Sequence, residues 1–114
     1  MLNTTLTPTA VDSDVATIAS MVVQVVEPRL ARLAERATQV GHTAQHPSVE
    51  KAAAIVLEDA LCLWRLGVLS RPVAHLRDIQ PFMVAVDARA TELVSARMAA
   101  LCESTAEDHR LRLR

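Results

Sequence analysis

The chain has 114 residues and a formal net charge of −1, and 51% of its residues are hydrophobic while only 2% are aromatic. This length allows one domain with a modest core, and this hydrophobic content excludes a disordered chain. A charge near zero removes the broad electrostatic argument for a nucleic-acid or anionic-membrane partner, so we expect a protein partner. We interpret residues 1–114 as a single helical domain, because strand-like alternation is missing.

The first part of the chain predicts an arm followed by a long helix. Residues 1–11 are rich in Thr and contain Pro8, which favours an extended arm. From about 12 to 40, apolar residues keep helical spacing straight across Pro28. Pro28 removes one backbone hydrogen bond, so it either kinks one helix or separates two, and we favour a single kinked helix. Gly41 is expected to end that helix.

The longest apolar stretch covers residues 49–67 and contains Trp64, the only tryptophan. Its apolar residues form one stripe at helical period and also spread beyond that stripe, which predicts a helix covered on several sides. Ser48 is expected to cap this helix and Gly67 to end it. We therefore place it at the centre of a bundle or in a subunit interface.

The remainder of the chain predicts two more helices and a tail. A short helix is expected over residues 71–79, and Pro81 is expected to begin a last helix of about 81–103. The charged segment 104–114 predicts a frayed tail. The expected fold class is therefore all-α, a small four-helix bundle with a long first helix kinked at Pro28.

One group of residues has the spacing of a metal site. His42, His46 and Glu50 are four residues apart, which on an unbroken helix would place three ligands on one face. Gly41 and Pro47 bracket the two histidines as a loop, however, so the helical geometry is not expected. We therefore predict no metal and no cofactor.

Catalytic groups are not evident in the sequence. The adjacent carboxylates Glu58 and Asp59 diverge by about 100° on a helix, so they do not address one substrate atom. Cys62 and Cys102 lie inside apolar helical patterns and are expected to be reduced core residues of a cytoplasmic protein. The apolar run 15–26 is too short to span a bilayer. Whether the protein is an enzyme stays open, and a non-enzymatic role is favoured.

Residues 66–77, LGVLSRPVAHLR, carry a Gly followed at set intervals by Val68, Val73 and Leu76. This pattern resembles the turn and recognition helix of helix-turn-helix DNA-binding proteins. The resemblance implies a DNA-binding regulator that uses residues 59–78. The side chains that would then meet DNA are Ser70, Arg71, Ala74, His75 and Arg77. The same sequence pattern also arises where a Gly ends a helix within a bundle, and we favour that interpretation.

Three classes of function fit these observations. We favour a small non-enzymatic module of regulatory, inhibitory or assembly type that binds another protein. The alternatives are the DNA-binding regulator and a helical-bundle small-ligand receptor or enzyme with a pocket near Trp64. The side chains expected to contact a partner or ligand are Trp64, Arg65, Glu58, Arg71, His75 and Arg77.

A homodimer is expected, because several of the predicted helices have more apolar faces than one small bundle can bury. On the first helix, Met21, Val23 and Val25 lie off the main apolar stripe and are expected to form the dimer interface. If they do not, the last helix is the next candidate, because its alanines make a face smooth enough for close helix approach.

Overall fold

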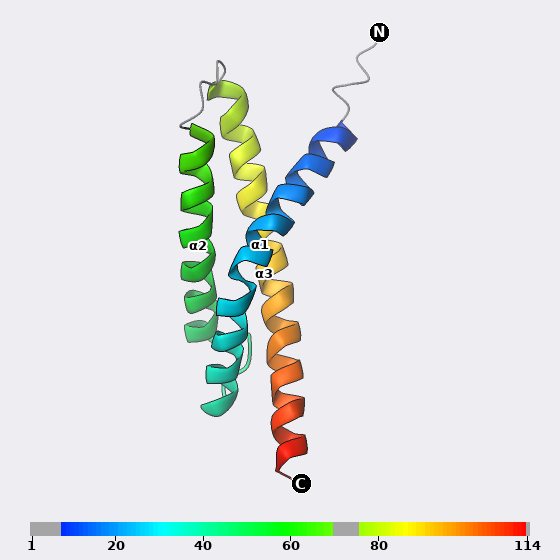
Figure 1. Ribbon diagram of the computed structural model, residues 1–114, viewed down its shortest axis with the longest axis vertical. Coiled ribbons are helices and arrows are strands. Elements are labelled where there is room, and N and C mark those ends of the chain that lie inside the picture. Colours follow the sequence, from blue (N-terminus) through cyan, green and yellow to red (C-terminus); the bar gives the residue numbers. More distant parts are fainter. Residues whose placement is uncertain (1–7, 70–75, 114) are drawn as a thin grey trace.

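The computed structural model describes residues 8–69 and 76–113, with side chains over 14–67 and 79–113, and it contains three helices in these ranges (Figure 1). They are α1 (Pro8–Gln39), α2 (Pro47–Leu69) and α3 (Leu76–Arg112), and each runs in the opposite direction to the one before it. The all-α prediction is confirmed, whereas the prediction of four helices is wrong. The molecule is elongated, since its radius of gyration is 17.4 Å where a compact domain of this length has about 13 Å.

The two helices expected in the second half of the chain are one. Residues 71–75 lie outside the described residues, and 76–79 form the first turn of α3. Pro81 lies inside α3 rather than at its start. Pro81 is the sixth residue of α3, so it removes one helical hydrogen bond, and little more than the first turn of the helix precedes it. The helix then continues to Arg112, so the segment expected to fray is helical to that point.

α1 starts earlier than the sequence suggested and passes through Pro28 without a break. Pro8 occupies its first position, where a proline loses nothing because that amide has no helical partner. Residues 8–11 are thus helical, while 1–7 lie outside the described residues. Pro28 is exposed, so the carbonyl one turn before it can bond water instead of the missing amide. One helix rather than two is therefore correct, and the kink stays a prediction.

Gly41 ends α1 as predicted. Its φ is +79°, a left-handed conformation that favours glycine. The His42 amide donates to the carbonyl of Ala37 at 2.8 Å, and the Gly41 amide donates to that of Thr38 at 3.1 Å. This pair of bonds is the Schellman motif, which satisfies the last carbonyls of a helix.

The predicted ends of α2 are both wrong by a short distance. The ring nitrogen Nδ1 of His46 accepts a hydrogen bond from the amide of Ser48 at 3.2 Å, so His46 is the cap and Pro47 the first helical residue. Gly67 lies inside the helix, which continues to Leu69, and it has no positive φ.

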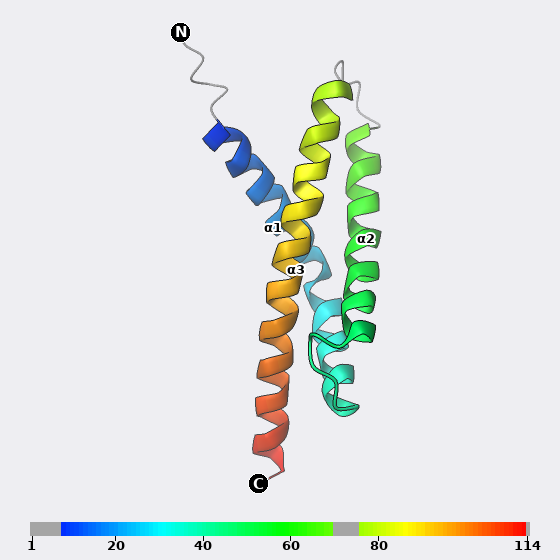
Figure 2. The ribbon, with the colours of Figure 1, turned by 180° about the vertical axis from the view of Figure 1, so that it is seen from behind.

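The core is built by rows of side chains four residues apart on α1 and α3. Such rows interlock when two helices cross obliquely, at about 50° in most globular proteins. Figures 1 and 2 both show α1 crossing α3 obliquely, with α2 lying beside them. The buried rows consist of Val22, Val26, Leu30 and Ala34 on α1 and of Val86, Ala90, Val94, Met98 and Cys102 on α3. The alanines let the two helices approach closely.

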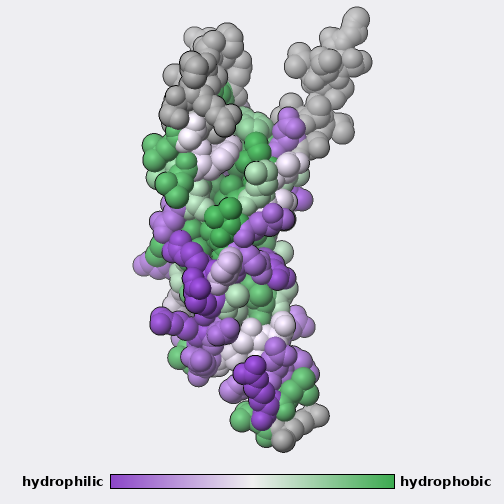
Figure 3. All heavy atoms as spheres, viewed as in Figure 1, coloured by the Kyte–Doolittle hydropathy of each residue, from purple (hydrophilic) through white to green (hydrophobic). Residues whose placement is uncertain are grey.

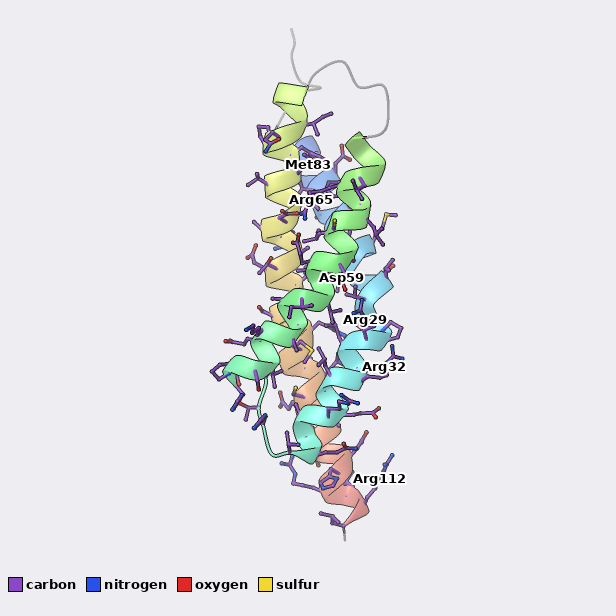
Figure 4. The ribbon with its side chains drawn as sticks, turned by 90° about the vertical axis from the view of Figure 1, so that its left-hand side faces the viewer. Arg29, Arg32, Asp59, Arg65, Met83 and Arg112 are labelled. Atoms are coloured by element: carbon purple, nitrogen blue, oxygen red, sulfur yellow. The ribbon has the colours of Figure 1, made fainter. Side chains whose placement is uncertain are left out.

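Each pair of helices also carries one ion pair. Two of the three pairs include a residue of α2, and Figure 4 labels three of the residues that form them, Arg29, Asp59 and Arg65. The pairs are Arg97 with Glu27 at 2.7 Å (α3 to α1), Arg29 with Asp59 at 3.4 Å (α1 to α2) and Arg65 with Asp87 at 2.9 Å (α2 to α3).

The two glycines should respond oppositely to alanine. Gly41→Ala should destabilise the protein by about 1–2 kcal/mol, because an L-residue is strained at positive φ. Gly67→Ala should stabilise it by about 0.5–1 kcal/mol, because alanine favours a helix interior. A new Cβ meets nothing within 4 Å at either site, so sterics do not enter the comparison. Urea denaturation of both variants measures the difference, and a shift of the same sign in both would contradict these assignments.

The pair between Glu27 and Arg97 should make stability depend on pH. Hydrogen bonds from Arg97 lower the pKa of Glu27, with burial opposing and the charge of Arg97 adding to the effect. The stabilisation is therefore present above the unfolded pKa of about 4.3 and is lost as pH falls through the lower folded pKa. Glu27→Gln should cost at most about 1 kcal/mol near neutral pH, and this cost should vanish in acid. A pH-independent cost would contradict the expectation.

Candidate functional site: the groove between α2 and α3

A groove with a volume of about 450 Å³ lies between α2 and α3. No described residue of α1 lines it, so it lies on the side of the two helices that α1 leaves uncovered. Its floor is apolar and consists of Val49, Ala53, Leu57, Leu61, Val94 and Met98. Its rim is polar and consists of Gln45, Glu50, Glu58, Asp87, Thr91 and Ser95.

The groove exists because the three helices do not pack equally closely against one another. α1 packs extensively against α3 and also against α2, whereas α2 and α3 pack much less against each other. Small residues keep the space between them open, since Ala53 and Ala54 face Thr91 and Ser95 there. The rim carries three carboxylates, of which Glu58 and Asp87 share the one guanidinium of Arg65 and Glu50 has no described ion-pair partner. The rim therefore keeps an excess of negative charge and favours a cationic or polar rim on whatever it binds.

Arg65 closes one end of the groove by joining α2 to α3. Its Nη1 donates to both carboxylate oxygens of Asp87, at 3.0 and 2.9 Å, and its Nη2 donates to Glu58. Burial lowers the pKa of Arg65, but the hydrogen bond to Glu58 and the charges of Asp87 and Glu58 outweigh it and raise the pKa overall. Figure 4 shows Arg65 reaching from α2 toward α3. We call these bonds from Arg65 to Asp87 and Glu58 the clasp, and they fix the spacing of the two helices at this end of the groove.

A second hollow of about 410 Å³ continues the groove along α3. The two hollows share Ala44 and Gln45, and the second is lined by Thr38 at the end of α1, by the α1–α2 loop and by residues of α3. Its α3 residues are Ala99, Cys102, Glu103 and Ala106. We call the two hollows together the trough. Burial raises the pKa of the Cys102 thiol, which therefore stays protonated and acts as a packing residue.

The structure brings together two of the six expected contact residues. Arg65 and Glu58 meet at the end of the trough. Trp64 does not line it; this side chain is half-buried and lies against Phe82, with ring centroids 6.3 Å apart. Arg71 and His75 lie outside the described residues.

The sequence did not single out Asp87, Ser95 or Met98, which belong to the trough. Asp87 pairs with a residue 22 positions away, and no local spacing announces such a contact. Thr91, Ser95 and Met98 do share one helical stripe, but small polar residues on a stripe are also typical of a solvated face. Their role became visible only when α2 was placed beside them.

The three residues expected at a dimer interface differ in exposure. Val23 is buried in the core, because it lies on the side of α1 that packs against α3. Met21 and Val25 are exposed, at 58% and 72%. On α2, Leu63 is exposed too. Leu63 lies one turn from Asp59, and Val25 lies one turn from Arg29, which is the residue that pairs with Asp59.

Because α1 and α2 are antiparallel, Val25 and Leu63 lie on the same side of the pair between Arg29 and Asp59. Figure 3 shows hydrophobic residues gathered on this face between the two helices. The apolar surface of α1 and α2 therefore consists of Met21, Val25, Leu63 and Leu66.

The sequence-based interpretations of the two histidines and of Cys62 can also be compared with the structure. The loop between α1 and α2 is confirmed, and in it the rings of His42 and His46 stack with centroids 3.7 Å apart. Among the side chains described over residues 14–67 and 79–113, no group of three or more from His, Cys, Asp or Glu is placed to hold a metal ion. Cys62 is exposed rather than buried, because it lies on the outer face of α2.

The resemblance to helix-turn-helix proteins placed a turn at Gly67, but that residue is helical. Residues 70–75, which include part of the expected recognition segment, lie outside the described residues. Arg77 belongs to the first turn of a helix of 37 residues, and its side chain is not among those described.

The chain matches no protein-family model, and no curated protein or solved structure is significantly similar to it. Within the described residues, no helix is both long enough and apolar enough to cross a membrane.

Removing the charge of Arg65 should loosen the α2–α3 pair. Arg65→Met keeps an apolar stem but loses the bonds to Asp87 and Glu58, so it should cost about 1 kcal/mol of unfolding free energy. The cost should shrink when salt is raised from about 0.1 to 1 M, which shortens the screening length from about 10 to 3 Å. Lys51→Met is the matched control, since Lys51 is exposed and has no described ion-pair partner. Equal effects of the two changes in urea denaturation would contradict a role for the clasp.

Proposed function

We propose that the protein is a non-enzymatic binding module whose trough receives a helix of another polypeptide chain. The observation that carries the proposal is the combination of an apolar floor with an acidic rim along about 20 residues of α3. A helix-binding groove needs such a floor for side chains at i, i+3, i+4 and i+7, and it needs polar edges that fix register.

The architecture supports the same proposal. Helical bundles commonly have four helices around one core, and the described chain supplies three. A fourth helix lying in the trough would contact α2 and α3 along the groove, and the α1–α2 loop and α3 along the second hollow. The carboxylates on the rim favour an incoming helix with basic residues beside its apolar stripe.

The chemistry of the trough favours binding over catalysis. Glu58 and Asp87 are held by Arg65, and the Cys102 thiol stays protonated. Neither arrangement supplies an activated nucleophile or a free general base. Apolar packing and charge pairing are what this surface can offer.

Photo-crosslinking tests the proposal for a partner of any identity. The exposed groove residue Ala54 is replaced by p-benzoyl-L-phenylalanine, and cells that produce the protein are irradiated. We expect an adduct with a second polypeptide, identified by mass spectrometry. Ser95→Arg should abolish the adduct, because it places a bulky cation inside the groove. Ala96→Arg should leave it intact, because Ala96 lies on the α1 side of α3. Absence of an adduct, or an adduct that survives Ser95→Arg, would contradict the proposed function.

A further inference from the structure

One stripe along α1 has the spacing of a coiled-coil seam and faces solvent. Its residues follow one another at alternating intervals of four and three, so they lie within about 40° of a single line along the helix. In this stripe Met21 and Val25 are 58% and 72% exposed, and Ile18 is half-buried. We call it the α1 stripe, and it consists of Asp14, Ile18, Met21, Val25, Pro28 and Arg32.

The helices of the chain's own fold leave the α1 stripe uncovered. Ala19 and Leu30, which are fully buried, lie on the opposite side of α1 and pack in the core. α2 lies beside the stripe and is joined to α1 by the pair between Arg29 and Asp59. The first half of α1 diverges from both α2 and α3 (Figures 1 and 2). The stripe is therefore an apolar helix face that its own chain does not use.

The two ends of the α1 stripe carry opposite charges. Asp14 precedes the apolar residues and Arg32 follows them, about 27 Å further along the helix. Both side chains are exposed, and neither has an ion pair with another described residue. Positions 14 and 32 are separated by about five whole turns, so the two charges lie at the same angle around α1.

We propose that the α1 stripe is the contact surface of a homodimer, in which α1 of a second copy docks antiparallel about a two-fold axis. The axis passes the helix halfway between Met21 and Val25, which is the midpoint of the stripe. The proposal goes beyond the proposed function, since it concerns a different surface from the trough and holds whether or not the trough receives a helix.

The stripe is its own complement about this axis. Met21 of each copy lies opposite Val25 of the other, and Ile18 lies opposite Pro28, so the centre of the contact is apolar. Asp14 of each copy lies opposite Arg32 of the other, on the same flank of the seam, which makes this charge pair twice in the dimer. A parallel arrangement would instead bring like charges together. Charge complementarity thus identifies both the second copy and its direction.

Residues of α2 extend the contact. Leu63 lies beside Val25 of its own chain, so in the dimer it is level with Met21 of the second copy. Leu66, also exposed, continues this row toward the end of α2. The apolar surface of α1 and α2 therefore flanks the seam instead of facing water. Met and Arg, both present here, are enriched in protein interfaces relative to other surfaces.

A charge swap tests the proposal in the purified full chain by sedimentation equilibrium. The unmodified protein should be a dimer at micromolar concentration, with twice the chain mass of 12.4 kDa. Asp14→Arg and Arg32→Asp each place like charges opposite each other twice, so each should raise the dimer dissociation constant about tenfold. The double variant Asp14→Arg/Arg32→Asp should restore the dimer, because it reverses both members of the pair.

Arg89→Asp is the matched control, since Arg89 is exposed, belongs to α3 and has no described ion-pair partner; it should leave the dissociation constant unchanged. Thermal melting monitored by circular dichroism checks that every variant is folded. A folded unmodified protein that stays monomeric on concentration would overturn the proposal. So would a dimer insensitive to the single changes, or a double variant that is no tighter than the singles.

The failure of this proposal is distinguishable from the failure of the proposed function. Asp14 and Arg32 do not line the trough, so the charge swap should leave the Ala54 adduct unchanged. A dimer that responds to the charge swap supports the α1 contact even if Ala54 gives no adduct, a result that contradicts the trough alone. A dimer that Ser95→Arg dissociates and the charge swap leaves intact would place the second copy in the trough and overturn the α1 contact.

Discussion

The oblique packing of α1 on α3 is the constraint on which the rest of the structure depends. Rows of side chains four residues apart on both helices interlock only at a crossing angle, and alanines bring the axes close. Because α1 takes up one side of α3 over much of its length, α2 reaches α3 along a narrower line. The groove lies between α2 and α3 on the side that α1 does not cover, and the second hollow of the trough lies between the α1–α2 loop and α3.

Charged residues define the position of each helix within this arrangement. One ion pair joins each pair of helices, and the clasp of Arg65 on Asp87 and Glu58 has the least exposed arginine of the five ion pairs described. Such pairs add little stability individually. Their effect here is geometric, because a bidentate bond from α2 to α3 fixes the spacing at one end of the trough.

The sequence by itself determined the helical class and the end of α1 at Gly41, and it favoured without deciding the continuity of α1 through Pro28. These are local properties, set by side-chain period, by the φ that only glycine adopts readily and by one register kept across a proline. Helix ends elsewhere were shifted by a few residues, because His46 replaced Ser48 as the cap and Gly67 is tolerated inside a helix. Such choices depend on small energy differences that a single residue type does not fix.

The tertiary structure alone decided the number of helices, the burial of Val23 and the identity of the site. Pro81 is compatible with either the start or the first turns of a helix, so the sequence could not tell two helices from one. Val23 lies off the main stripe and is buried only because α3 crosses α1 on that side. The trough depends on contacts such as that of Arg65 with Asp87, which join residues far apart in sequence. Only the packing of three helices brings such residues together, since periodicity fixes the face of a helix but not the neighbour that the face meets.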